Sequence, residues 1–81
     1  MELFRIEEYL NNTIDNQIKK VKEELAEVEA EIEKFPHDHD KLTEEVGDLL
    51  QAVYTLSLIL KLCPKKVSAM LKDKFIERGV L

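Results

Sequence analysis

The feature that most constrains the fold is a stripe of apolar residues that repeats at helical spacing in the first half of the chain. Six aliphatic residues follow one another at steps of four, three, four, three and four: Ile14, Ile18, Val21, Leu25, Val28 and Ile32. Such steps place all six side chains on one face of an α-helix, from about residue 14 to 34. Pro36 ends this helix, because its ring disfavours the α conformation of the preceding Phe35.

A second long helix is predicted after a short linker, residues 36–40. Because the linker is short, this helix should return antiparallel to the first. Asp38 or Asp40 can cap its N-terminus, and the helix should continue to about Leu62. Its second half, residues 49–60, is apolar on nearly every side. A helix of this kind must be covered all round, which one neighbouring helix cannot do.

The two ends of the chain are predicted to be helical as well. Pro64 suits the first turn of a last helix, residues 65–78, and Gly79 suits its C-terminal cap. At the other end, the apolar residues within 3–10 indicate a short helix. We expect the polar residues 11–13 to separate it from the first long helix.

Composition supports an all-α protein that assembles with itself. With two glycines, two prolines and no alternating β-branched runs, the chain is predicted to form one domain, residues 1–81. Its fold should be an antiparallel helical bundle of three to four helices, completed by oligomerisation. A chain of this length buries only about 60% of its unfolded surface, and its one cysteine, Cys63, cannot form an internal disulfide. We therefore expect a homodimer or homotetramer, and the lone thiol favours a cytoplasmic location.

Charge and hydropathy argue against two classes of partner. The net charge of −5 arises from 17 acidic and 12 basic residues. Such a surface repels phosphate polymers, so we expect no nucleic acid polymer as a partner. The most apolar stretch, residues 49–62, is too short to span a bilayer and contains Gln51 and Lys61. We expect no membrane partner either.

Two pairs of acidic residues have a spacing that suits a shared ion. Glu24 and Glu27 lie on the first long helix, and Glu45 and Asp48 lie on the second. The i, i+3 spacing puts both members of a pair on one helix face, and antiparallel packing would gather all four at the edge of the core. Clustered carboxylates repel one another without a cation, and hard oxygen ligands suit Mg²⁺ or Mn²⁺.

The alternative is that these acids form only a solvated helix face, since a chain this acidic produces such pairs by chance. Gly47 argues against that reading for the second pair. Glycine costs about 1 kcal/mol in a helix interior, which suggests that another helix or a ligand approaches closely there. A di-iron site is disfavoured, because it uses Glu-x-x-His pairs and neither His37 nor His39 follows a glutamate by three residues.

Both pairs belong to a longer pattern. Lys22-Glu23-Glu24-Leu25-Ala26-Glu27 is followed, after a spacer, by Glu44-Glu45-Val46-Gly47-Asp48-Leu49-Leu50. An apolar helix, a turn with Pro64, Lys74-Phe75 and Arg78 come next. Over residues 18–79 this order resembles the E-x-x-E … E-x-x-D signature of the MazG superfamily of all-α nucleotide pyrophosphohydrolases.

The resemblance implies an enzyme that hydrolyses an NTP or dNTP between the α- and β-phosphates, giving a monophosphate and pyrophosphate. It implies the following roles: Glu24, Glu27, Glu45 and Asp48 as Mg²⁺ ligands, with Mn²⁺ a possible substitute, Glu23 as activator of the attacking water, and Lys74 and Arg78 as phosphate-binding residues. The chain departs from the pattern at Lys72, where many members have asparagine, and in its short N-terminal segment, which in relatives helps to form the base pocket. For Lys74 and Arg78 the alternative is that they only complement a helix C-terminus.

Two other functions stay open. One is phosphoribosyl-ATP pyrophosphatase, a related enzyme of the histidine pathway with similar acidic pairs, although residues 47–50 resemble the MazG pattern more closely. The other is a non-catalytic helical interaction module, which predicts no metal-dependent change in stability or activity.

Overall fold

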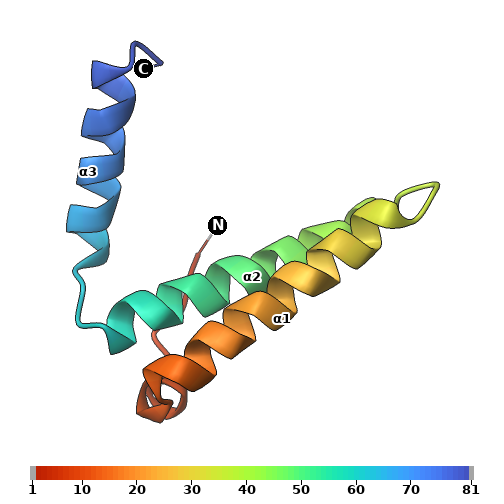
Figure 1. The fold of residues 1–81 in the computed structure, drawn as a ribbon, viewed down its shortest axis with the longest axis horizontal. Helices are drawn as coiled ribbons and strands as arrows, with labels where there is room; N and C mark the ends of the chain where they lie inside the picture. Colours follow the sequence, from red (N-terminus) through yellow and green to blue (C-terminus); the bar gives the residue numbers. More distant parts are fainter. Residues whose placement is uncertain (1, 81) are drawn as a thin grey trace.

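The computed structural model describes residues 2–80, and all regular structure within them is helical. A short 3₁₀ helix η1 (Glu7–Asn11) precedes three α-helices, α1 (Ile14–Glu33), α2 (His39–Ile59) and α3 (Pro64–Glu77). Helices α1 and α2 lie side by side and antiparallel, and α3 leaves the end of α2 at a steep angle (Figure 1). The all-α prediction is confirmed.

Local capping groups set the starts of the two long helices. The Thr13 hydroxyl accepts a hydrogen bond from the Asn16 N–H at 3.1 Å, so α1 begins after the predicted break at residues 11–13. The Asp38 carboxylate accepts one from the Lys41 N–H at 3.1 Å, so Asp38 is the cap of α2. Both satisfy backbone donors that have no partner inside the helix.

The ends of α2 and α3 use the same C-terminal motif. At the end of α3, Gly79 has a φ of 74° and the Val80 N–H returns to the Phe75 carbonyl at 2.9 Å, as predicted for a glycine cap. Helix α2 ends at Ile59 and not at Leu62. Lys61 adopts the left-handed conformation, with a φ of 59°, and the N–H of Leu62 donates a hydrogen bond to the Ser57 carbonyl.

The face that α1 turns toward α2 is not its most apolar one. The buried residues of α1 are Gln17, Glu24, Val28 and Glu31, and those of α2 are Glu45, Ala52 and Thr55. The apolar stripe of α1 stays partly in solvent, with Ile14 45%, Leu25 44% and Ile32 52% exposed. The prediction that the carboxylates lie at the edge of the core is therefore wrong for Glu24 and Glu45. The seam between α1 and α2 is mainly polar, and most of the apolar stripe stays partly exposed, although its member Val28 is buried in the seam.

Helix α3 does not close a bundle within one chain. It contacts α2 but, over residues 2–80, not α1, and the two helices are bent by 112°. Val67, Met70 and Leu71 are between 46% and 63% exposed. The Cα radius of gyration is 14.7 Å, whereas a compact chain of this length has about 12 Å.

Within the described residues, no single helix has the length and hydropathy needed to cross a membrane. Helices α2 and α3 meet that criterion only when taken together across their bend, and by length and composition alone.

Candidate metal centre and adjoining pocket

Three carboxylates meet in the middle of the seam between α1 and α2. Glu24 and Glu27 lie one turn apart on α1, and Glu45 faces them from α2, with one oxygen from each within 4.8 Å of the others. Oxygens that share one ion at about 2.1 Å lie up to about 4.2 Å apart. Small side-chain rotations would therefore bring the three oxygens to a common divalent cation.

Two oxygens in this cluster have no hydrogen-bond partner. Glu24 is 5% exposed and Glu45 is 6% exposed, and the Oε2 atom of each is buried without a donor. A buried polar atom left without a partner costs about 1–3 kcal/mol, and more if charged. A cation between the two residues would satisfy both oxygens, so this donor set fits a hard metal ion.

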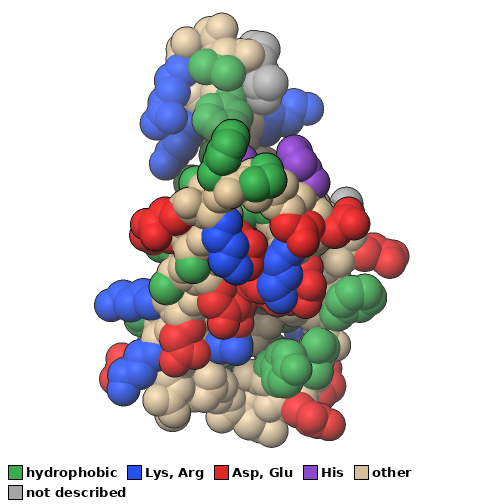
Figure 2. Space-filling view, turned by 90° about the vertical axis from the view of Figure 1, so that its right-hand side faces the viewer, with side chains coloured by type: hydrophobic (Ala, Val, Ile, Leu, Met, Phe, Trp, Pro, Cys, Tyr) green, Lys and Arg blue, Asp and Glu red, His purple; other side chains and the backbone are tan. Residues whose placement is uncertain are grey.

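The other oxygen of each buried glutamate is held by a lysine one turn earlier on the same helix. Lys20 Nζ lies 2.8 Å from Glu24 Oε1, and Lys41 Nζ lies 3.1 Å from Glu45 Oε1. Each carboxylate is thus fixed through one oxygen and open at the other. Figure 2 shows acidic side chains gathered on one face of the hairpin that α1 and α2 form, with basic side chains among them.

The three carboxyl groups lie close together, which favours a proton on one of them. Hydrogen bonding to Glu45 and Glu24, together with repulsion by the Glu24 charge, raises the pKa of Glu27 to about 7. Lys41 lowers the pKa of Glu45. A proton on Glu27 would give the cluster the donor that it lacks when all three groups are ionised, and a metal ion would replace this proton.

Asp48 lies one turn beyond Glu45 on α2, on the side of a pocket. It is exposed and stands outside the three-carboxylate cluster, but it lines the pocket together with Glu24. Loss of hydration, followed by the charges of Glu24 and Glu45, raises its pKa. Asp48 and Glu24 thus both border the pocket, although only Glu24 of the two belongs to the three-carboxylate cluster.

The pocket has a volume of about 480 Å³, within the usual range for small-molecule sites. Its carboxylate end is formed by Lys20, Glu24 and Asp48. Its other walls are Phe4, Ile6 and Tyr9 from the N-terminal segment, and Gln17, Gln51, Ala52 and Thr55 from the hairpin. The pocket thus combines a charged end with two aromatic side chains.

Gln51 holds the N-terminal segment over the hairpin. Its side-chain oxygen accepts from the Phe4 N–H at 2.9 Å, and its amide donates to the Phe4 carbonyl at 2.8 Å. The same segment shares a smaller cavity with Gly47.

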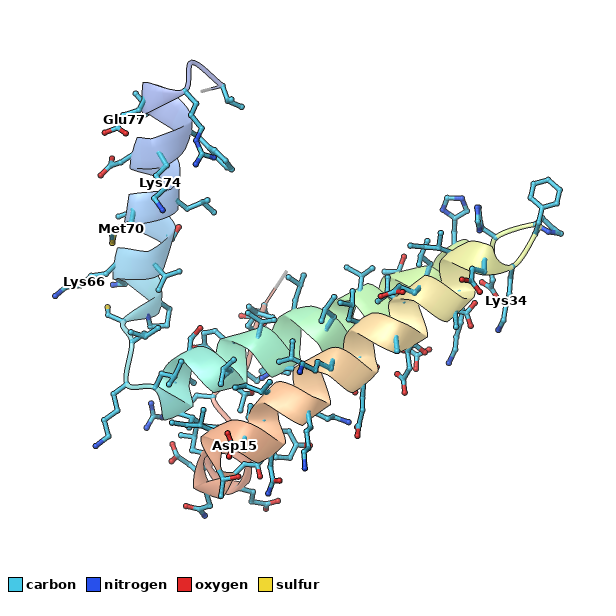
Figure 3. All side chains as sticks on the ribbon, viewed as in Figure 1. Asp15, Lys34, Lys66, Met70, Lys74 and Glu77 are labelled. Atoms are coloured by element: carbon cyan, nitrogen blue, oxygen red, sulfur yellow. The ribbon has the colours of Figure 1, made fainter. Side chains whose placement is uncertain are left out.

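The structure does not bring the remaining sequence-predicted site residues to the carboxylates. Glu23 is exposed on α1, about 100° round the helix from Glu24. Lys74 projects from α3, well away from the α1–α2 hairpin (Figure 3), and Arg78 follows at the end of that helix. Sequence reasoning also missed Lys20 and Lys41, although their i, i+4 spacing to Glu24 and Glu45 was visible.

Comparison with models of protein families identifies a family for this chain. The model of the MazG nucleotide pyrophosphohydrolase domain matches residues 12–79, which include both acidic pairs and α3. No curated protein and no solved structure matches the chain. Since the family model covers well over half of the sequence, the chain belongs to the MazG nucleotide pyrophosphohydrolase family.

Proposed function

We propose that this protein is a Mg²⁺-dependent nucleotide pyrophosphohydrolase that cleaves an NTP or dNTP between the α- and β-phosphates. Family membership supports pyrophosphohydrolase activity in general. The observation that supports the metal dependence and the nucleotide substrate is the pair of buried, unpartnered oxygens of Glu24 and Glu45 beside a pocket of suitable size.

In this proposal Glu24, Glu27, Glu45 and Asp48 hold Mg²⁺, and Mn²⁺ can substitute. The ion, when bound, polarises phosphate oxygens and offsets their charge. Asp48 and Glu24 line the pocket, so a nucleotide there would have its phosphates at the carboxylate end. Phe4 and Tyr9 would then lie beside the base, where an aromatic face can stack on it.

Glu23 is proposed to orient the attacking water. Its carboxylate is exposed and immediately precedes a metal ligand in the chain. A carboxylate outside the three-carboxylate cluster can accept the proton of the attacking water while the cluster residues hold the ion.

The enzyme is proposed to act as a homodimer or homotetramer. The chain exposes 6592 Å², whereas a compact protein of its mass exposes about 5,000 Å². The difference is of the size that one subunit loses in a stable homodimer, and the outward stripe of α1 and the apolar face of α3 are the surfaces to cover. Lys74 and Arg78 would have to reach phosphates in such an assembly, since α3 lies apart from the carboxylates of its own chain. Light scattering that finds a folded monomer at micromolar concentration contradicts this part.

The proposal is tested by a panel of NTPs, dNTPs and phosphoribosyl-ATP, read by pyrophosphate release with Mg²⁺ and with a chelator. We expect Mg²⁺-dependent pyrophosphate from at least one nucleoside triphosphate. Release from phosphoribosyl-ATP alone would assign the histidine-pathway activity instead. Release of free phosphate without pyrophosphate would overturn the proposed cleavage.

A further inference from the structure

Lys20 belongs to two features at once, because it pairs with a proposed metal ligand and also lines the pocket. We propose that Lys20 changes partner during the binding cycle. It holds Glu24 in the metal-free protein, and it binds the polyphosphate of the nucleotide once the carboxylates have a metal ion. This inference rests on the proposed function and adds to it a phosphate-binding residue from the same chain.

The position of Lys20 supports both halves of the exchange. Its Nζ lies 2.8 Å from Glu24 Oε1, while its side chain remains 55% exposed. The ammonium group keeps much of its contact with water, which weakens its attraction to the carboxylate. The contact is therefore easy to give up when another anion is offered nearby.

Charge provides the reason for the exchange. A divalent ion on Glu24 repels the ammonium group and weakens its attraction to the carboxylate. A triphosphate brings several negative charges into the pocket that Lys20 lines. A lysine is a compact charge on a flexible stem, so it can follow a phosphate oxygen over a short distance without any movement of α1.

Lys41 provides a matched comparison on the other helix. It pairs with Glu45 at 3.1 Å with the same i, i+4 spacing, and its side chain is 44% exposed. It is not among the residues that line the pocket. If the lysines served only to neutralise the buried carboxylates, the two positions would behave alike toward phosphate.

The test compares Lys20→Met, Lys41→Met and Lys20→Arg with the wild-type chain by calorimetry. Mn²⁺ is titrated without nucleotide, and inorganic tripolyphosphate is titrated at saturating Mg²⁺. We expect both methionine variants to bind Mn²⁺ about two- to five-fold more tightly, since each loses a competing cation. The affinity of Lys20→Met for tripolyphosphate should be at least about ten-fold lower than that of the wild type. The affinities of Lys41→Met and Lys20→Arg should change little.

Equal tripolyphosphate affinity of Lys20→Met and the wild type would overturn the inference. So would an equal loss in both methionine variants, because that would reflect general charge alone, or a wild type that does not bind tripolyphosphate. These results leave the proposed function standing if the wild type still releases pyrophosphate from a nucleotide. Circular dichroism of each variant confirms that the helices are retained.

Discussion

Replacing Glu24 by glutamine tests whether the buried cluster is a metal site, and Glu31 supplies a close control. Both residues are buried on the same face of α1, at 5% and 6% exposure. Each pairs at 2.8 Å with a lysine, Lys20 and Lys34 respectively, that is more than half exposed. Only Glu24 belongs to the three-carboxylate cluster, and of the two only Glu24 has a buried oxygen without a partner.

The two substitutions should change metal-free stability in opposite directions. Each removes one partly exposed ion pair, worth about 0.3–1 kcal/mol. Glu24→Gln also replaces the unpartnered oxygen by an amide that can donate to its acidic neighbours, which recovers about 1–3 kcal/mol. We therefore expect Glu24→Gln to stabilise the metal-free protein by about 1 kcal/mol, or about 4–8 °C in a domain of this size. Glu31→Gln should destabilise it slightly.

Added Mg²⁺ should make the wild type more stable than Glu24→Gln, which reverses their order of stability without metal. A ligand at 100 times its Kd stabilises the folded state by about 2.7 kcal/mol. The wild type and Glu31→Gln should gain this stability, and Glu24→Gln should lose most of it. Thermal unfolding in a chelator and over a Mg²⁺ series measures both effects. An equal response of all three proteins to Mg²⁺ would refute the metal site.

Three further predictions concern protonation, the pocket and the water-activating residue. The folded protein holds a proton on Glu27 between pH 4.5 and about 7 that the unfolded chain has lost, so metal-free stability should fall as pH rises across this range. Mg²⁺ must displace that proton, so calorimetry should show affinity rising with pH through about 7, a trend that Glu27→Gln removes. Gln51→Leu deletes both hydrogen bonds to Phe4. We therefore expect faster proteolysis near residue 4 and a higher KM for the nucleotide. Unchanged values would contradict a role for the N-terminal segment in the pocket. Glu23→Gln should lower kcat by about 10²–10⁴-fold while calorimetry still shows metal binding; a loss of both would make Glu23 a ligand.

The helices were predictable because local chemistry sets their limits. Pro36, Pro64 and Gly79 act on their own backbone and immediate neighbours, and all three mark helix ends in the structure. The end of α2 was placed too late, because nothing in the apolar pattern indicates that Lys61 adopts a left-handed conformation. That residue also sets where α3 leaves the hairpin.

The orientation of α1 could not be predicted from its periodicity. Gln17, Glu24 and Glu31 lie in the seam, to one side of the apolar stripe of α1. Val21 and Val28 belong both to this seam face and to the stripe. Hydrophobic periodicity identifies the most apolar face of a helix, and it does not say whether that face meets the same chain or a different one. In this protein the more polar face meets α2, and most of the apolar stripe stays partly exposed.

The clustering of three of the four predicted carboxylates was predictable, whereas the walls of the pocket were not. Residues three apart on a helix share a face whatever the tertiary structure, which is why Glu24 and Glu27 lie together. Phe4 reaches the pocket from an irregular segment that Gln51 holds by hydrogen bonds, and Tyr9 reaches it from η1. No sequence period encodes the path of such a segment.

Hydrolysis in ¹⁸O-labelled water tests the central claim most directly. The wild-type protein is incubated with Mg²⁺ and the nucleotide that the substrate panel identifies, and both products are analysed by mass spectrometry. Attack at the α-phosphorus, as proposed here, places the label in the monophosphate and none in pyrophosphate. Label in pyrophosphate would mean attack at the β-phosphorus, and label in free phosphate would mean removal of the γ-phosphate; either result would contradict the mechanism.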